Sequence, residues 1–129
     1  MIILDTHIWV WWVHGERQLS QSAKQIIQSN ESTGLGISAI SCWEVAKLVE
    51  YQRLKLPCEV LDWLNQALVY PGITLIELTP EIAVASTQLT GFHRDPADQI
   101  IVATAQVYDC PLVTVDTKIV GYPAIQTLP

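Results

Sequence analysis

The chain has 129 residues, of which half are hydrophobic and 16% are charged, so it is not a disordered chain and we predict one globular domain over residues 1–129. A net charge of −6 argues against a protein that grips nucleic acid through a broad basic face. Nucleic acid stays open as a substrate, because acids gathered around a divalent cation present a positive centre.

Nothing in the sequence indicates a membrane or secreted protein. The longest apolar run, residues 8–13, is too short to span a bilayer. The N-terminus lacks the basic region and the small-residue cleavage site of a signal peptide. We therefore expect no membrane partner and a cytoplasmic location.

The three cysteines indicate neither a disulfide framework nor a zinc site. Their number is odd, their spacings are long, and no C-x-x-C occurs. We predict that Cys42, Cys58 and Cys110 are buried as small hydrophobic residues.

The chain opens with four apolar residues that run into Asp5. A short apolar run closed by a polar residue is typical of a buried strand in a parallel sheet. Ligands of open α/β sheets bind just beyond the carboxyl ends of the strands, which is where Asp5 would lie. Asp5 could equally cap the helix predicted over residues 7–13, since Asp and Thr both favour that position.

The helix over residues 7–13 carries three tryptophans, Trp9, Trp11 and Trp12, which cannot all face one core. A helix wedged between two layers would explain them. An exposed patch that binds a partner or a second copy of the chain is the interpretation that we favour.

The remaining elements alternate along the chain. Helices are expected over residues 20–29, from about 41, over 57–69, from 79 to about 89, and over 96–108. Strands are expected over residues 35–38, 73–78 and 110–115, and around 125–128. The alternation predicts an α/β fold with a mainly parallel sheet.

Three acids near predicted helix starts resemble Asp5 in their placement. Glu44 lies within the first turn of the helix from about residue 41, although it also fits a capping box with Ser41. Asp95 and Asp98 take the N-cap and N3 positions of the helix over 96–108, and capping needs only one of them.

The last acid, Asp116, ends the strand over 110–115 as Asp5 ends the first. Thr114 alternates with apolar neighbours in that strand and could support a site. Asp5, Glu44, Asp98 and Asp116 could all project toward one edge of the sheet, where their charges would repel. Carboxylate oxygens suit Mg²⁺ or Mn²⁺, and one or two such ions can activate a water and stabilise a phosphoryl transition state.

Four stretches in this order resemble PIN-domain proteins, and within that family the VapC-type toxins. They are Ile-Leu-Asp-Thr-His ending at His7, Ile-Ser-Ala-Ile-Ser-Cys-Trp-Glu ending at Glu44, Asp-Pro-Ala-Asp-Gln-Ile-Ile-Val-Ala-Thr-Ala beginning at Asp95, and Leu-Val-Thr-Val-Asp ending at Asp116. The resemblance implies a three-layer fold with a five-stranded parallel sheet, and a metal-dependent ribonuclease. It also implies homodimers and an antitoxin protein that blocks the site.

Carried over residue by residue, the resemblance implies that the ligands of Mg²⁺ or Mn²⁺ are Asp5, Glu44, Asp98 and Asp116. Asp98 is preferred to Asp95 because the apolar helix that follows it matches the family. Residues that could support the site or touch the substrate are Thr6, His7, Asp95 and Thr114. The alternative is a PIN-like module that has lost catalysis and binds a partner.

Two positions depart from the commonest family pattern. His7 stands where Asn or Ser is frequent, and Gln99 stands where a basic residue is often found. Both changes bear on the contact with RNA. His7, and also His93 with Arg94 before the last acidic helix, could instead touch a substrate phosphate.

Overall fold

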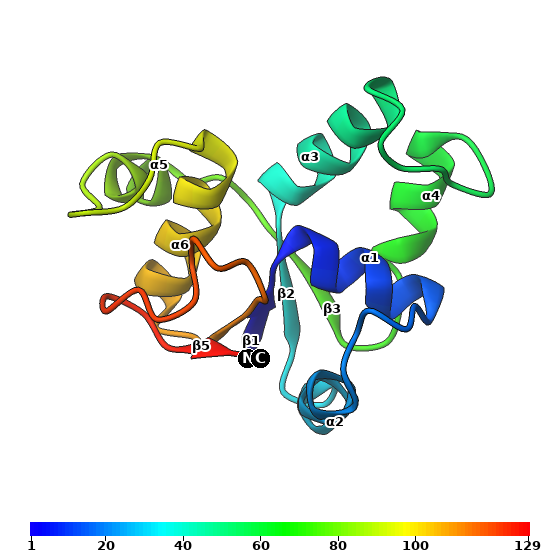
Figure 1. Ribbon diagram of the computed structural model, residues 1–129, viewed down its shortest axis with the longest axis horizontal. Helices are drawn as coiled ribbons and strands as arrows, with labels where there is room; N and C mark the ends of the chain where they lie inside the picture. Colours follow the sequence, from blue (N-terminus) through cyan, green and yellow to red (C-terminus); the bar gives the residue numbers. More distant parts are fainter.

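The computed structural model describes all residues from 1 to 129 and shows a three-layer α/β fold (Figure 1). Its sheet is parallel and five-stranded, as predicted, and the strand order is β3-β2-β1-β4-β5. The strands are β1 (Ile2–Leu4), β2 (Leu35–Ser38), β3 (Ile73–Ile76), β4 (Leu112–Val113) and β5 (Thr127–Leu128). The helices are α1 (Thr6–His14), α2 (Gln21–Asn30), α3 (Ala39–Glu50), α4 (Val60–Ala67), α5 (Pro80–Ser86) and α6 (Pro96–Tyr108). None of them combines the length and apolar content needed to cross a bilayer.

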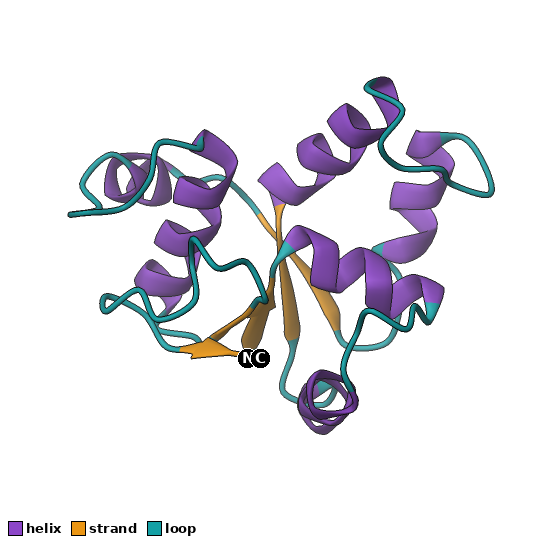
Figure 2. Ribbon diagram, viewed as in Figure 1, coloured by secondary structure: helices purple, strands orange, loops and turns teal.

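The central strand β1 sends side chains into both helical layers, because successive residues of a strand point to opposite faces. Ile2 and Leu4 belong to the larger core, which α1, α2 and α4 cover. Ile3 belongs to the smaller core, which α5 and α6 cover. Helices therefore flank the sheet on both sides (Figure 2), and the carboxyl end of β1 lies in the middle of the molecule.

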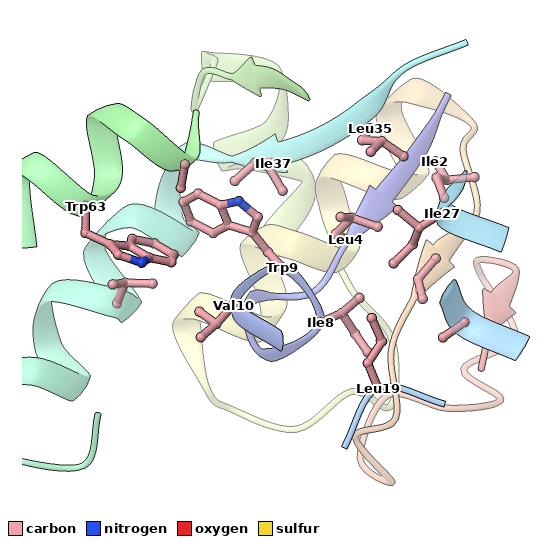
Figure 3. Close-up of a cluster of buried hydrophobic side chains, with 14 residues drawn as sticks. Ile2, Leu4, Ile8, Trp9, Val10, Leu19, Ile27, Leu35, Ile37 and Trp63 are labelled. Atoms are coloured by element: carbon pink, nitrogen blue, oxygen red, sulfur yellow. The ribbon is translucent and has the colours of Figure 1, made fainter. Parts of the chain in front are cut away.

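The larger core is built around two tryptophans (Figure 3). The rings of Trp9 on α1 and Trp63 on α4 are tilted, with centroids 5.2 Å apart, and both residues are buried. Trp63 Nε1 donates a 2.9 Å hydrogen bond to His14 Nε2. The expected exposed tryptophan patch is therefore wrong: Trp9 is fully buried, and Trp11 and Trp12 are half-buried against this core. Helix α1 packs into the larger core, where its Trp9 contacts Trp63 of α4.

The smaller core leaves no room for a side chain at Gly36 in β2. A Cβ atom there would lie 2.6 Å from Ile76 Cδ1 and 2.7 Å from Ile3 Cδ1. Both isoleucines are buried, so neither methyl group can swing into solvent. Glycine at this position lets the isoleucines of the two neighbouring strands close over β2.

Several predicted boundaries differ from the structure. Helix α3 begins at Ala39, because Ser38 Oγ accepts a hydrogen bond from Ile40 N and caps it. The predicted capping box at Ser41 is therefore wrong, and Glu44 lies in the second turn of the helix. Three other elements are shorter than expected: α4 covers 60–67, β3 ends at 76 and α5 ends at 86.

The last strand pair is also shorter than expected. Strand β4 ends at Val113, since its partner β5 offers only two residues for pairing. Asp116 therefore follows the strand in a loop rather than ending it. The predicted burial of the cysteines is wrong as well. Cys58 is exposed in the loop before α4, and Cys42 and Cys110 are half-buried free thiols.

Candidate active site

Three carboxylates meet beyond the carboxyl end of β1. Asp5, Glu44 and Asp98 each offer an oxygen atom, and these atoms all lie within 4.8 Å of one another. Asp5 lies at the junction of β1 and α1, Glu44 lies on α3 and Asp98 lies on α6. These three helices begin at the same end of the sheet (Figure 1). Asp5 is 7% exposed, Asp98 is 8% exposed and Glu44 is half-buried, so two of the three acids are withdrawn from solvent.

Asp5 has both carboxylate oxygens held by hydrogen bonds. Oδ1 accepts from the Thr6 backbone N–H at 2.9 Å, and Oδ2 accepts from Thr114 Oγ1 at 2.7 Å. The same hydroxyl oxygen accepts from the Asp116 N–H at 3.1 Å. Asp5 therefore caps α1 and also faces the site, so the two interpretations of this residue are compatible.

Glu44 is held by the hydroxyl of Thr6. Thr6 Oγ1 lies 2.6 Å from Glu44 Oε1 and 2.8 Å from Ser41 Oγ. A hydroxyl has one proton to donate, and an ionised carboxylate can only accept. We therefore assign the Thr6 proton to Glu44 and the Ser41 proton to Thr6. Ser41 was missed as a supporting residue, although its position one helical turn before Glu44 gives the two a common face.

Asp95 and Asp98 take different roles at the start of α6. Asp95 is exposed and caps the helix, its Oδ1 accepting from two backbone N–H groups of the first turn, one of them that of Asp98. The carboxylate of Asp98 instead joins the group of three. The structure thus places Asp98, rather than Asp95, among the converging acids.

His93 touches Asp98 instead of facing away from the protein. Its Nε2 atom lies 3.1 Å from Asp98 Oδ2 but makes no well-directed hydrogen bond. The Asp95 N–H donates to His93 Nδ1 at 3.4 Å, which places the proton of a neutral ring on Nε2, toward the acid. Gln99, the second departure from the family pattern, donates from Nε2 to the His93 carbonyl at 3.0 Å and so fixes this turn.

Asp116 lies at the edge of the site. It is half-buried and stands outside the mutually close group of three. Its Oδ1 accepts from the Lys118 N–H at 2.9 Å. Its negative charge nevertheless acts on Asp5, Glu44 and Asp98.

Burial and mutual repulsion raise the pKa of each of the three converging acids. For Asp98 the pKa rises to about 7, first through desolvation and then through the charges of Asp95, Asp5 and Glu44. Burial also raises the pKa of Asp5, against the hydrogen bonds from Thr114 and Thr6. Burial raises that of Glu44, against the hydrogen bond from Thr6. At neutral pH the group needs protons or a cation to balance its charge.

The donor set fits a hard divalent cation. No lysine or arginine forms an ion pair with any of these acids. Buried carboxylate oxygens without a neutralising side chain are the ligands that Mg²⁺ and Mn²⁺ prefer, and a site with sulfur ligands is excluded by the composition of the group.

Comparison with known proteins identifies the family. Residues 2–124 match the family model of the PIN domain, and the chain therefore belongs to the PIN-domain family. It is similar to ribonuclease VapC22 of Mycobacterium tuberculosis (strain ATCC 25618 / H37Rv), with 35% identity over 119 residues, which is 92% of this chain and 88% of that protein.

Solved structures share the fold at lower identity. The match to VapBC2 from Rickettsia felis, bound to a DNA fragment from its promoter, has a TM-score of 0.72 and 18% identity and covers 99% of this chain and 98% of that one. The match to FitAcB from Neisseria gonorrhoeae has a TM-score of 0.70 and 21% identity, and it covers 100% of this chain and 97% of that one. These likenesses confirm the predicted fold class.

Proposed function

We propose that this protein is a metal-dependent endoribonuclease of the VapC type, the toxin of a toxin–antitoxin pair, which hydrolyses RNA phosphodiester bonds. One observation carries the proposal: three carboxylates from three separate elements, two of them buried and Glu44 half-buried, offer oxygen atoms within 4.8 Å of one another, and no lysine or arginine pairs with them. The similarity to a ribonuclease over most of the chain supports the same reaction.

The residues that would hold Mg²⁺ or Mn²⁺, as one or two ions, are Asp5, Glu44 and Asp98, with Asp116 at the edge. When bound, a divalent cation supplies Lewis acidity, which activates water and offsets the charge of the phosphoryl transition state. The protein contributes fixed oxygen atoms. Thr114 and Thr6 hold Asp5 and Glu44 in one orientation, which lowers the entropy lost when a ligand is bound.

Asp98 would carry the pH dependence of the site. Its pKa is raised to about 7, so it keeps a proton at pH values at which an exposed aspartate is ionised. His93 Nε2 lies 3.1 Å from Asp98 Oδ2. Loss of that proton gives the carboxylate that a cation requires.

The partners follow from the same assignment. The solved structures that share the fold include a toxin–antitoxin complex from Klebsiella pneumoniae. We therefore propose an antitoxin protein that covers the acidic site, and a homodimer as the assembled form of this chain.

The first test is thermal unfolding of the purified protein in EDTA, in Mg²⁺ and in Mn²⁺, repeated on Asp98→Asn. A cation that binds only the folded state raises the unfolding midpoint. We expect a rise with Mn²⁺ that is lost in the variant. No rise at millimolar metal would contradict the proposed site and favour a PIN-like module that binds a partner without catalysis.

The second test is cleavage of a mixture of cellular RNA by wild type and by Asp5→Asn. The variant keeps an oxygen to accept from Thr6 N and removes one of the repelling charges. We expect it to lose cleavage while its unfolding midpoint stays level or rises. Cleavage at the wild-type rate by a highly purified Asp5→Asn protein would exclude Asp5 from the reaction.

A further inference from the structure

A hollow lies along α1, the helix that Asp5 caps. It has a volume of about 240 Å³ and lies between α1 and the segment that follows α3. The lining residues that matter here are His7, Trp11, His14, Glu16, Arg53 and Lys55. We call it the α1 pocket.

The α1 pocket is rich in positive charge for this chain. The protein has 7 lysine and arginine residues and a net charge of −6, yet two of the seven line this one hollow. Arg53 and Lys55 form no ion pair, whereas Lys47 is paired with Glu50 at 2.8 Å. Glu16 is the only acid in the lining, so the pocket keeps a positive balance.

One residue links the α1 pocket to the acidic site. His7 lines it, and His7 is two residues from Asp5, on which its charge acts. An extended strand with one phosphate at Asp5 would therefore reach the pocket with a neighbouring nucleotide. Because the protein is acidic overall, an RNA strand needs such a positive surface beside the scissile phosphate.

Two rings supply a surface for a base. Trp11 is half-buried and His7 is exposed, and their rings are tilted with centroids 6.0 Å apart. Bases of single-stranded RNA stack on aromatic side chains, and phosphates bind lysine and arginine beside them. The pocket offers both within one hollow.

We propose that the α1 pocket binds a nucleotide next to the scissile bond of single-stranded RNA, with Arg53 and Lys55 on its phosphate and with His7 and Trp11 against its base. This proposal rests on the proposed ribonuclease function and assigns where the substrate continues beyond the acids. Arg53 and Lys55 are substrate-positioning residues in this assignment.

The test compares Arg53→Gln/Lys55→Gln with Lys24→Gln, which removes a charge from α2, outside the pocket. Binding of a short fluorescent single-stranded RNA is measured by anisotropy in Mg²⁺, on an Asp98→Asn background that does not cleave. Each phosphate contact to a single strand contributes about 0.7 to the slope of log K against log salt. We expect the double variant to bind about tenfold more weakly, with a slope smaller by about 1.4. Circular dichroism confirms that each variant is folded.

Cleavage kinetics with the active protein give the second readout. We expect the double variant to raise KM by a similar factor with kcat unchanged, because the contacts are the same in substrate and transition state. Equal affinity and equal salt slope in the double variant and in Lys24→Gln would overturn the assignment and leave a protein partner as the occupant. If the wild type cleaves no RNA, the proposed ribonuclease function is wrong. The binding comparison still tests, independently of cleavage, whether the α1 pocket binds RNA.

Discussion

Thr114 Oγ1 donates a 2.7 Å hydrogen bond to Oδ2 of Asp5, a residue 109 positions earlier in the chain. Both residues are buried, so water cannot replace the bond. We expect Thr114→Val to weaken Mn²⁺ binding or RNA cleavage by about 10–100-fold, as is usual when a residue that orients a metal ligand is lost. Stability in EDTA should fall by about 1.5–3 kcal/mol, because a buried acceptor loses its donor.

Thr114→Ser is the matched control. It keeps the hydroxyl that bonds Asp5 and loses only a methyl group, so it should keep most of the activity. Titration with Mn²⁺, followed by the unfolding midpoint, compares the two variants. Equal metal affinity in Thr114→Val and wild type would show that this hydrogen bond does not position Asp5 for a ligand.

The pKa of Asp98 predicts how stability depends on pH. In the folded, metal-free protein this pKa is about 7, against an ordinary value of 3.8. Between these values the folded state keeps a proton that the unfolded state has lost, so stability should fall as pH rises from about 4 to about 7. Asp5 and Glu44, whose pKa values are also raised, act in the same direction.

Urea unfolding in EDTA across this pH range measures the effect. Asp98→Asn should show a flatter profile and should be the more stable protein at neutral pH and above. In Mn²⁺ the wild-type profile should turn upward with pH, because the cation competes with the proton for the same oxygens. Parallel profiles for wild type and Asp98→Asn would contradict a raised pKa at this residue.

The two acids at the start of α6 can be separated by substitution. Asp95 accepts two backbone N–H groups, so Asp95→Ala should cost about 0.5–2 kcal/mol of stability as a lost helix cap. Asp95→Asn keeps an acceptor oxygen and should restore most of that loss. Both should still cleave RNA, whereas Asp98→Asn should not. Loss of cleavage in a fully folded Asp95→Asn protein would move the direct role to Asp95.

Gly36 gives a test of the packing beneath the site. A Cβ atom there would approach Ile76 Cδ1 to 2.6 Å, so Gly36→Ala should destabilise the protein by about 1–3 kcal/mol through overpacking. Ile76→Val removes that Cδ1 atom. The double variant Gly36→Ala/Ile76→Val should therefore lose less unfolding free energy than the sum of the losses in the two single variants. A double-mutant cycle of unfolding free energies measures this difference.

Much of the fold could be predicted because its signals are local. Apolar runs ending in polar residues located the strands, and Asp95 followed by Pro96 located the start of α6. Once Asp95 is recognised as the N-cap, Asp98 must lie at position N3, three residues later. The sheet edge at which Asp5 and Asp98 meet then follows from the parallel arrangement.

The rest depends on contacts between distant segments. The burial of Trp9 requires Trp63, which arrives with α4 from more than 50 positions away. Ser38 and Ser41 are equally good helix caps by type, but α3 begins directly after β2 ends at Ser38, so Ser38 caps the helix. The hydrogen bonds of Thr6 to Ser41 and Glu44 appear only once α1 and α3 are packed.

The three converging carboxylates belong to segments on different sides of the sheet. Asp5 leads into α1 over the larger core, and Asp98 begins α6 over the smaller core. Charge at this point therefore sets up a repulsion between segments of different layers, which a bound cation would relieve. Binding of a cation would therefore stabilise the starts of both helices against local opening. Hydrogen exchange of the backbone amides in the first turns of α1 and α6 would slow together as the site is filled.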